Sequence, residues 1–493
     1  FLKDKQTGAV TLVSSTSVGT QGNGASYQPS ISADGRYVVF TSDASNLVGD
    51  DANAVADVFV KDTQTGVLTL VSSSLLGVTG SASSTLPSIS SDGRYVAFQS
   101  DASNLVDDDT NGKADVFVRD TLTGVTTLVS SDLNGVPGNG SSGQPSISPD
   151  GMYVAFQSDA SNLLPGNEDT NGFNDIFVKH WQTGAITRAS TAVDGTQGDN
   201  GAIQPSISED GRYVAFVSRS TNLVSGGTIG ESDIFKKDMQ TGAISLVSST
   251  SSGVEATGIS LEPVISWDGR YVAFHSAATN LDPRATNGRN QVYVKDTQPG
   301  GVTTLVSYDS SGLASIGAGS PSISGDGRYV AFTSLYLTPD DNTAAPNIFV
   351  RDTQMGTITM IDTNADGVQA NAGSGQASIS WDGRYVAFSS NATNLAPGAT
   401  NAVNQIYVKD TQIGAITLVS TDAAGLPGNG YTAVPTISMD GHHVAFVSSS
   451  TNLVAGDTNG AIDIFRGVIY PKVSSIVRTT PVGPLTNAAS VDF

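Results

Sequence analysis

An internal repeat constrains the fold of this 493-residue chain more than any other feature. Asp-Gly pairs recur in one fixed context, with spacings of 58, 58, 60, 58, 58, 56 and 58 residues. The eight pairs are Asp34-Gly35, Asp92-Gly93, Asp150-Gly151, Asp210-Gly211, Asp268-Gly269, Asp326-Gly327, Asp382-Gly383 and Asp440-Gly441. Eight copies at one period indicate that the chain is built from eight equivalent structural units.

Each repeat contains four short apolar segments, which in the second repeat are residues 87–90, 95–100, 115–120 and 125–130. They are rich in Val, Ile, Phe, Tyr and Thr and are bounded by Gly, Asp, Asn or Ser, which is typical of β-strands. The Asp-Gly pair predicts a tight hairpin between the first two strands, and a Thr-x-Thr-Gly segment predicts another between the last two. We therefore expect one four-stranded antiparallel sheet per repeat.

A four-stranded sheet with two apolar faces cannot bury both faces alone. Sheets that stack face to face cover one another, and only a closed ring leaves no apolar end exposed. The sequence therefore predicts an all-β, eight-bladed β-propeller of four-stranded antiparallel blades. No segment shows sustained helical periodicity.

The two ends of the repeat region indicate how the ring closes. Residues 1–13 copy the third and fourth strands of a repeat, whereas the last repeat has its first two strands at residues 435–448 and a third at 463–465. We expect residues 10–14 to supply the missing fourth strand. Phe1-Leu2 then duplicates a third strand that is already present, so one copy must lie outside the sheet. The predicted domain limits are 1–470 for the propeller and 471–493 for a linker and a further segment.

Composition excludes several classes of partner. The chain has 24 Lys and Arg against 46 Asp and Glu, a net charge of −22. That charge opposes binding to nucleic acid or to anionic lipid. Cysteine is absent, which excludes disulfides and thiolate chemistry. No apolar run reaches the roughly 18 residues that a membrane-spanning helix needs, so we expect no direct membrane insertion.

The repeat resembles a known family. Segments of the form Pro-Ser-Ile-Ser-x-Asp-Gly-Arg-Tyr-Val-Ala-Phe and Asp-Ile-Phe-Val-Lys-Asp are similar to the WD40-like repeats of TolB-type propellers over roughly residues 1–468. The resemblance implies the propeller fold but no single function, since the family includes binding platforms, enzyme-associated domains and surface-protein modules. Residues 474–493 resemble the first strands of a bacterial immunoglobulin-like domain, as found in large surface proteins; the alternative is an ordinary C-terminal tail.

The loop before the third strand of the second repeat carries the strongest candidate site. Asp107, Asp109, Asn111 and Asp115 alternate around Gly112, and the backbone carbonyl of Lys113 would add a further ligand. Oxygen donors at this spacing suit Ca²⁺, and the pattern resembles the calcium loops of EF-hands and of integrin-type propeller blades. The alternative is that Asp and Asn only form local turns. Partial copies of the pattern are Asp51, Asn53 and Asp57; Asn167, Asp169, Asn171 and Asp175; and Asp457, Asn459 and Asp463.

A recurring Arg follows the Asp-Gly pair, and a recurring Asp ends the third strand, as at Arg94 and Asp120. In the third repeat both are replaced together, by Met152 and His180, which suggests that the two positions are partners within a blade. The Asp could instead only cap its own turn. Either role is architectural. Trp267 and Trp381 share a hairpin position that tolerates any residue, so we expect them to face solvent, with sugar stacking as an alternative.

No grouping of nucleophile, histidine and acid, and no phosphate-binding loop, is visible in the sequence. We therefore expect a protein that is not an enzyme: a non-catalytic, adhesin-like or structural propeller module of a bacterial extracellular or cell-surface protein, with Ca²⁺-binding loops. Its expected partners are other domains or copies of a larger surface protein. The first alternative is a propeller that binds a cell-surface glycan or protein, and the second is a polysaccharide-active enzyme.

Overall fold

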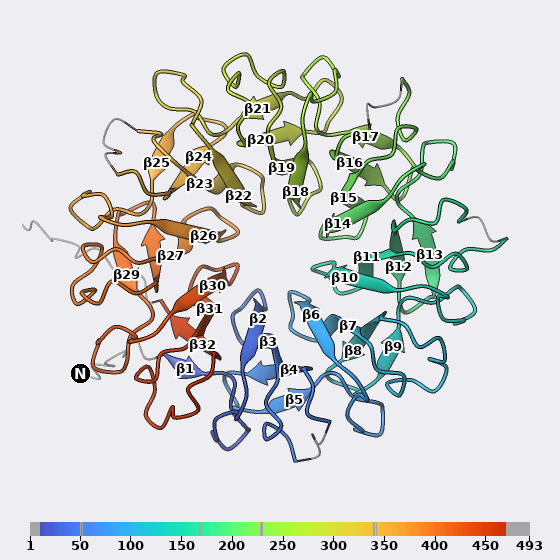
Figure 1. Ribbon diagram of the computed structural model, residues 1–493, viewed down its shortest axis with the longest axis horizontal. Helices are drawn as coiled ribbons and strands as arrows, with labels where there is room; N and C mark the ends of the chain where they lie inside the picture. Colours follow the sequence, from blue (N-terminus) through green and yellow to red (C-terminus); the bar gives the residue numbers. More distant parts are fainter. Residues whose placement is uncertain are drawn as a thin grey trace, which may run out of the picture.

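The computed structural model describes residues 10–469 except 50, 52, 167–168, 227–229, 339–340 and 342. The described residues form thirty-two β-strands and no helix. The strands make eight four-stranded antiparallel sheets, which stand as blades around a central axis (Figure 1). The predicted eight-bladed β-propeller is therefore confirmed. We number the blades 1 to 8 in chain order. None of the described segments is a helix that could cross a membrane.

In blades 1 to 7 the strands follow the chain outward from the axis, whereas in blade 8 the outermost strand is β1; the innermost strands surround the centre in Figure 1. Blades 1 to 4 are β2 (Ser26–Ile31), β3 (Tyr37–Ser42), β4 (Asp57–Asp62), β5 (Leu68–Leu70); β6 (Ser84–Ile89), β7 (Tyr95–Ser100), β8 (Asp115–Asp120), β9 (Thr126–Leu128); β10 (Ser142–Ile147), β11 (Tyr153–Ser158), β12 (Asp175–His180), β13 (Ala185–Arg188); and β14 (Ala202–Ile207), β15 (Tyr213–Ser218), β16 (Asp233–Asp238), β17 (Ile244–Leu246). Blades 5 to 7 are β18 (Ser260–Ile265), β19 (Tyr271–Ser276), β20 (Gln291–Asp296), β21 (Thr303–Leu305); β22 (Ala318–Ile323), β23 (Tyr329–Ser334), β24 (Asn347–Asp352), β25 (Ile358–Met360); and β26 (Ser374–Ile379), β27 (Tyr385–Ser390), β28 (Gln405–Asp410), β29 (Ile416–Leu418). Blade 8 is β30 (Thr432–Ile437), β31 (His443–Ser448), β32 (Asp463–Val468) and β1 (Thr11–Leu12).

The apolar cores lie between neighbouring blades. One core combines Val38, Phe40 and Phe59 of blade 1 with Ala445 and Val447 of blade 8, all of them buried. In every blade an aromatic side chain of the second strand packs against one of the third, and the ring centres are 5.7 to 6.0 Å apart. The middle strands are therefore covered on both faces, which explains their continuous Val-Ala-Phe runs.

The first described residues close the ring. Thr11 pairs with Arg466 and Leu12 with Phe465, so β1 becomes the outermost strand of blade 8. The predicted closure by residues 10–14 is confirmed. β32 holds the third-strand position of this blade, whereas Phe1-Leu2 lies outside the described residues, as do residues 471–493.

The Asp-Gly turns are joined by a second closed circle of hydrogen bonds. In each blade a backbone N–H of the turn donates to a turn carbonyl of the next blade, over 2.9 to 3.3 Å. The donors are Ala33, Ser91, Asp150, Glu209, Trp267, Gly325, Trp381 and Met439, and Met439 donates back to Ala33. In blade 3 Asp150 takes over because Pro149 has no N–H. Each blade is thereby tied to both neighbours.

The glycine of each Asp-Gly turn also receives a side chain of the preceding blade. Gly93 has φ +75°, and a Cβ added there would collide with the ring of Tyr37. The same contact recurs around the propeller and ends with His443 of blade 8 against Gly35 of blade 1. Glycine is needed here both for the left-handed backbone and for the close approach.

A buried cation links most blades to the preceding one. The Lys61 ammonium donates to the carbonyls of Ser15 and Thr16, both over 2.8 Å. Its equivalents in blades 2 to 7 are Arg119, Lys179, Lys237, Lys295, Arg351 and Lys409, whereas blade 8 has Gly467. Burial lowers the pKa of Lys61 to about 8. These cations satisfy carbonyls of the loop that follows the outermost strand.

Candidate functional site

The predicted cation loops end at one repeated position, the first residue of the third strand. Each blade buries a polar side chain there, and the eight residues are Asp57, Asp115, Asp175, Asp233, Gln291, Asn347, Gln405 and Asp463. In blade 2 the Asp115 carboxylate accepts hydrogen bonds from the Ser130 hydroxyl and from Asn111 Nδ2, both over 2.6 Å. The strand start thus anchors the loop that precedes it.

The Asn111 side chain takes part in three hydrogen bonds around its loop. Its Nδ2 donates to Asp115 and, over 2.8 Å, to the carbonyl of Gly138, while its Oδ1 accepts the N–H of Lys113 over 2.7 Å. The Asn111 side chain therefore forms the local turn of the alternative interpretation, and its role as a cation ligand stays a prediction. Asp107 and Lys113 are exposed, whereas Asp109 and Asp115 are buried.

The carboxylates of Asp109 and Asp115 do come together. Only 4% of Asp109 is exposed, and its Oδ1 has no hydrogen-bond partner. Burial is the main cause that raises the pKa of Asp115 to about 6, and the negative charge of Asp109 raises it further. Burial raises the pKa of Asp109 as well. Burial therefore accounts for most of both pKa shifts, and the neighbouring acid adds to that of Asp115.

The other predicted copies differ in how their acids are partnered. In blade 1 Asn53 Nδ2 donates to Asp57 over 2.8 Å, and both oxygens of the buried Asp51 lack a hydrogen-bond partner. In blade 8 Asn459 Nδ2 donates to Asp463 over 3.2 Å, while Gln21 Nε2 donates to both Asp457 and Asp463.

In blade 3 Gln197 Nε2 donates to Asp169 and Asp175, and Asn171 Nδ2 donates to the Gly198 carbonyl. Arg188 adds a positive charge 3.4 Å from Asp175 and 3.7 Å from Asp169. Asn167 lies outside the described residues. Within the described part of the chain no three or more acids and histidines converge on one point.

The sequence did not indicate a further residue that lies beside each acidic loop. It belongs to the connector that leaves the outermost strand, and in chain order it is Gln21, Thr79, Pro137, Gln197, Glu255, Ala314, Gln369 and Pro427. The connector follows each acidic loop by about half a repeat, and in blade 8 it comes from the opposite end of the chain. A shared position in the repeat was the only signal, and the residue types there vary.

The predicted Arg–Asp partnership is confirmed in six blades. Arg212 Nη2 lies 2.8 Å from Asp238 Oδ2, and its guanidinium covers the Tyr213 ring with 4.8 Å to the ring centre. Asp238 Oδ1 also accepts the N–H of Gln240 in the following turn, so the Asp has both predicted roles. The Arg212 hydrogen bond is the main cause that lowers the pKa of Asp238 to about 2.

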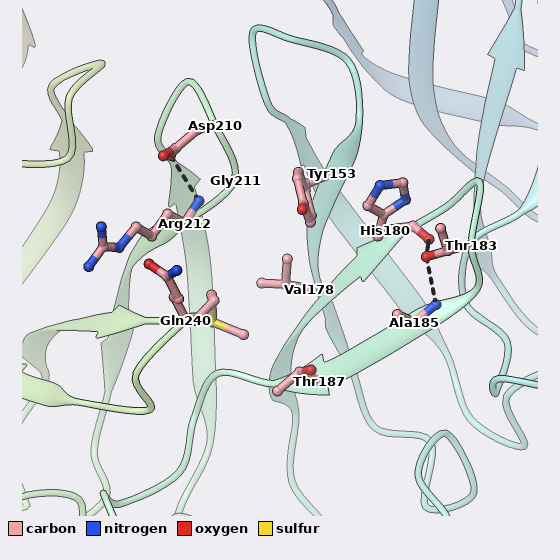
Figure 2. Close-up of a pocket in the computed structure, with 11 residues that line it drawn as sticks. Tyr153, Val178, His180, Thr183, Ala185, Thr187, Asp210, Gly211, Arg212 and Gln240 are labelled. Carbon is pink, nitrogen blue, oxygen red and sulfur yellow. Dashed lines mark hydrogen bonds between the residues drawn. The ribbon is translucent and has the colours of Figure 1, made fainter.

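Blade 3, which lacks this pair, has a pocket of about 440 Å³ against blade 4. Figure 2 shows His180 and Tyr153 on one side and Asp210 and Arg212 on the other. His180 contacts the Tyr153 ring edge-on, with 4.8 Å between ring centres. A hollow of similar volume lies between blades 1 and 2, where Asp62 stands in the place of His180. The pocket is therefore a feature of the blade interface and not of one blade.

The central channel is lined by a ring of residues with left-handed backbone. One residue in each innermost strand has φ between +49° and +56°: Gln28, Leu86, Gln144, Gln204, Glu262, Ser320, Gln376 and Val434. Each lies in a β-bulge, as the register shift of β6 against β7 shows. Gln28 Oε1 accepts the N–H of Leu86 in the next blade over 3.0 Å. Glu262 is the one charged member, and its Oε2 lies 3.3 Å from His275 Nδ1.

Comparisons with known proteins identify no family. No family model matches the sequence, and neither does any curated protein. Among solved structures, an oligogalacturonate lyase in complex with manganese is 14% identical, with a TM-score of 0.47 and 95% of each chain covered. The β-propeller domain of the Trilobed protease from Pyrococcus furiosus is 13% identical, with a TM-score of 0.43 over 78% of this chain and 95% of that one. TolB from Acinetobacter baumannii is 15% identical, with a TM-score of 0.33 over 76% and 80%. These proteins are similar to this chain as β-propellers.

Proposed function

We propose that the chain is a non-catalytic propeller module of a bacterial extracellular or cell-surface protein, with an adhesin-like or structural role. The ring would act as a rigid disc, and its rim loops would contact other domains or further copies of the larger protein. The net charge of −22 keeps such a disc soluble outside the cell and apart from nucleic acid.

One observation carries the proposal: the recurring charged side chains are engaged in contacts that hold the ring together. The Arg–Asp pairs join strands within a blade, and the buried lysines and arginines bind carbonyls of the preceding blade. An active site needs reactive side chains that are not used in such structural contacts and that lie together in one cavity. In this propeller the Arg–Asp pairs repeat in six blades and the buried lysines and arginines in seven.

A binding role at the channel is the second candidate, and Glu262 with His275 favours it. They place a carboxylate and an imidazole on one side of an otherwise uncharged ring of channel residues. Trp381, 46% exposed on an Asp-Gly turn, adds a flat apolar surface of the kind that stacks on sugars. A glycan or a protein loop would be the ligand, with Glu262 and Trp381 as two separate points of contact.

Three measurements on the full chain test these roles. Protease accessibility on intact bacteria should show the protein at the cell surface, and a panel of polysaccharides should yield no products. Release of oligosaccharides at rates typical of enzymes would contradict the non-catalytic role. A glycan array would distinguish the second candidate, since glycan binding that is lost in Glu262→Gln or Trp381→Ala would favour the ligand-binding role over the structural one.

A further inference from the structure

Two blades reveal a point at which two buried carboxylates share one donor. In blade 8 Gln21 Nε2 lies 2.6 Å from Asp457 Oδ1 and 2.8 Å from Asp463 Oδ2. In blade 3 Gln197 Nε2 lies at the same two distances from Asp169 Oδ1 and Asp175 Oδ2. A single nitrogen within hydrogen-bond reach of both acids shows that the two side chains converge on one position. The amide hydrogens there offset part of the charge.

Blade 2 has the same two acids without this donor. Pro137 stands where Gln21 and Gln197 stand, and a proline side chain has no hydrogen to donate. Asp115 is fully buried and Asp109 is 4% exposed, yet Asp109 Oδ1 has no hydrogen-bond partner. A buried and unpaired carboxylate is unfavourable, and proteins compensate it with a cation or a donor. In blade 2 the Asn111 amide donates, of the two acids, to Asp115 alone, and no described protein group donates to Asp109 Oδ1.

We propose that blade 2 binds a divalent cation between Asp109 and Asp115, at the position that the glutamine nitrogen occupies in blades 3 and 8. Oxygen donors select a hard cation, and Ca²⁺ tolerates an irregular site completed by water better than Mg²⁺ does. Two carboxylates give a weak site, with a dissociation constant on the order of 10⁻⁴ to 10⁻³ M, as in extracellular calcium modules. The inference is independent of the proposed surface role.

The repeat provides its own control variants. Pro137→Gln copies the residue of blades 3 and 8 and should fill the position in blade 2 with an amide. Asp109→Asn removes one of the two acids. Asp108→Asn makes the same charge change in an exposed neighbour and serves as the matched control. All proteins compared carry Asp51→Asn, so that the similar pair in blade 1 does not contribute.

Thermal unfolding of the full chain in EDTA and in 10 mM CaCl₂ at equal ionic strength tests the proposal. In the Asp51→Asn background and with Asp108→Asn, calcium should raise Tm by about 2 °C, and MgCl₂ should raise it less. Pro137→Gln and Asp109→Asn should remove the shift, and equilibrium dialysis should show one calcium fewer. No shift in the background protein, or an unchanged shift in Pro137→Gln, would overturn the proposal.

Removing the shared glutamine donor of blade 8 should create a further cation site in that blade. Gln21→Ala, with the residue that blade 5 has at Ala314, should leave Asp457 and Asp463 without their shared donor. The expected result is one additional calcium per chain in dialysis. Uptake that does not increase would show that the glutamine nitrogen does not mark a cation position, and would also overturn the proposal.

Discussion

At the scale of single residues, the turn glycines show how one position serves two purposes. The sequence indicated a tight turn at each Asp-Gly pair, and the positive φ of Gly93 agrees with that. The structure adds the ring of Tyr37, which lies where a Cβ would be. Gly77 has a similar φ of +79° but has no atom within 4 Å of an added Cβ. An alanine would therefore strain the backbone at both positions but collide with a neighbour only at Gly93.

Gly93→Ala should therefore destabilise the propeller more than Gly77→Ala. Left-handed backbone costs an alanine about 1 to 2 kcal/mol at either position, and the collision with Tyr37 should add about 1 to 3 kcal/mol at Gly93 alone. Thermal unfolding of both variants measures the difference. Equal losses would mean that Tyr37 moves away freely and that the ring contact is not a constraint.

In blade 6 the buried acid stands at a different position of the repeat. Asn347 stands at the strand start where five blades have Asp and two have Gln, and Asp362 stands where the other blades have the partner Ser. Asp362 is fully buried and accepts the N–H of Ile348 over 3.1 Å. Burial is the main cause that raises its pKa from 3.8 to about 7.

This shift predicts a pH-dependent contribution to stability. Between pH 4 and 7 the folded protein holds a proton on Asp362 that the unfolded chain has lost, so this group's contribution to stability falls as the pH rises through that window. Asp362→Asn keeps the acceptor for Ile348 without the charge. Its Tm relative to the native chain should be similar at pH 4 and higher by about 2 °C at pH 8. A difference that does not change with pH would contradict the buried titration.

At the scale of elements, the hairpin between the third and fourth strands depends on its Asp more than on the Arg. Asp238 receives Arg212 and the turn N–H of Gln240, whereas Arg212 is about one-third exposed. An exposed ion pair contributes about 0 to 1 kcal/mol. The hydrogen bond by which Asp238 caps the turn adds roughly another 1 kcal/mol. The sequence indicated both roles but could not rank them.

Asp238→Ala should thus lower the stability more than Arg212→Ala. We expect losses of about 1 to 2 kcal/mol and up to about 1 kcal/mol respectively, measured by thermal unfolding. High salt should weaken the effect of Arg212→Ala and leave most of the effect of Asp238→Ala, because only the ion pair is screened. Equal and salt-sensitive losses would assign the whole effect to the ion pair.

At the scale of the whole molecule, the two described ends are joined by a short strand. β1 has two residues, Thr11 and Leu12, yet it completes blade 8. Leu12 packs on the core between blades 7 and 8, and the adjacent Val13 lies in the core between blades 8 and 1. Opening this strand would expose apolar faces of these blades. The ring is closed independently at the Asp-Gly turns, where Met439 donates to Ala33.

A disulfide across this seam should stabilise the propeller. Thr11→Cys with Arg466→Cys places the new residues directly opposite each other, and the natural chain has no cysteine to interfere. Closing so long a loop is expected to contribute about 2 to 4 kcal/mol. The oxidised variant should melt above its own reduced form, a comparison in which the loss of Arg466 cancels. Equal melting temperatures of the two forms would contradict the expected stabilisation by the cross-link.

The sequence by itself determined the number of blades, their strands and the closing segment, because each follows from local turn chemistry and from the need to bury two apolar faces. It also located the acids at Asp109 and Asp115. Only the tertiary structure decided which acids are partnered. Gln21 and Asp457 are 436 residues apart, and no local rule relates an acidic loop to the connector beside it. Their contact depends on how closely neighbouring strands and loops pack, and that is set by the side chains of the whole ring.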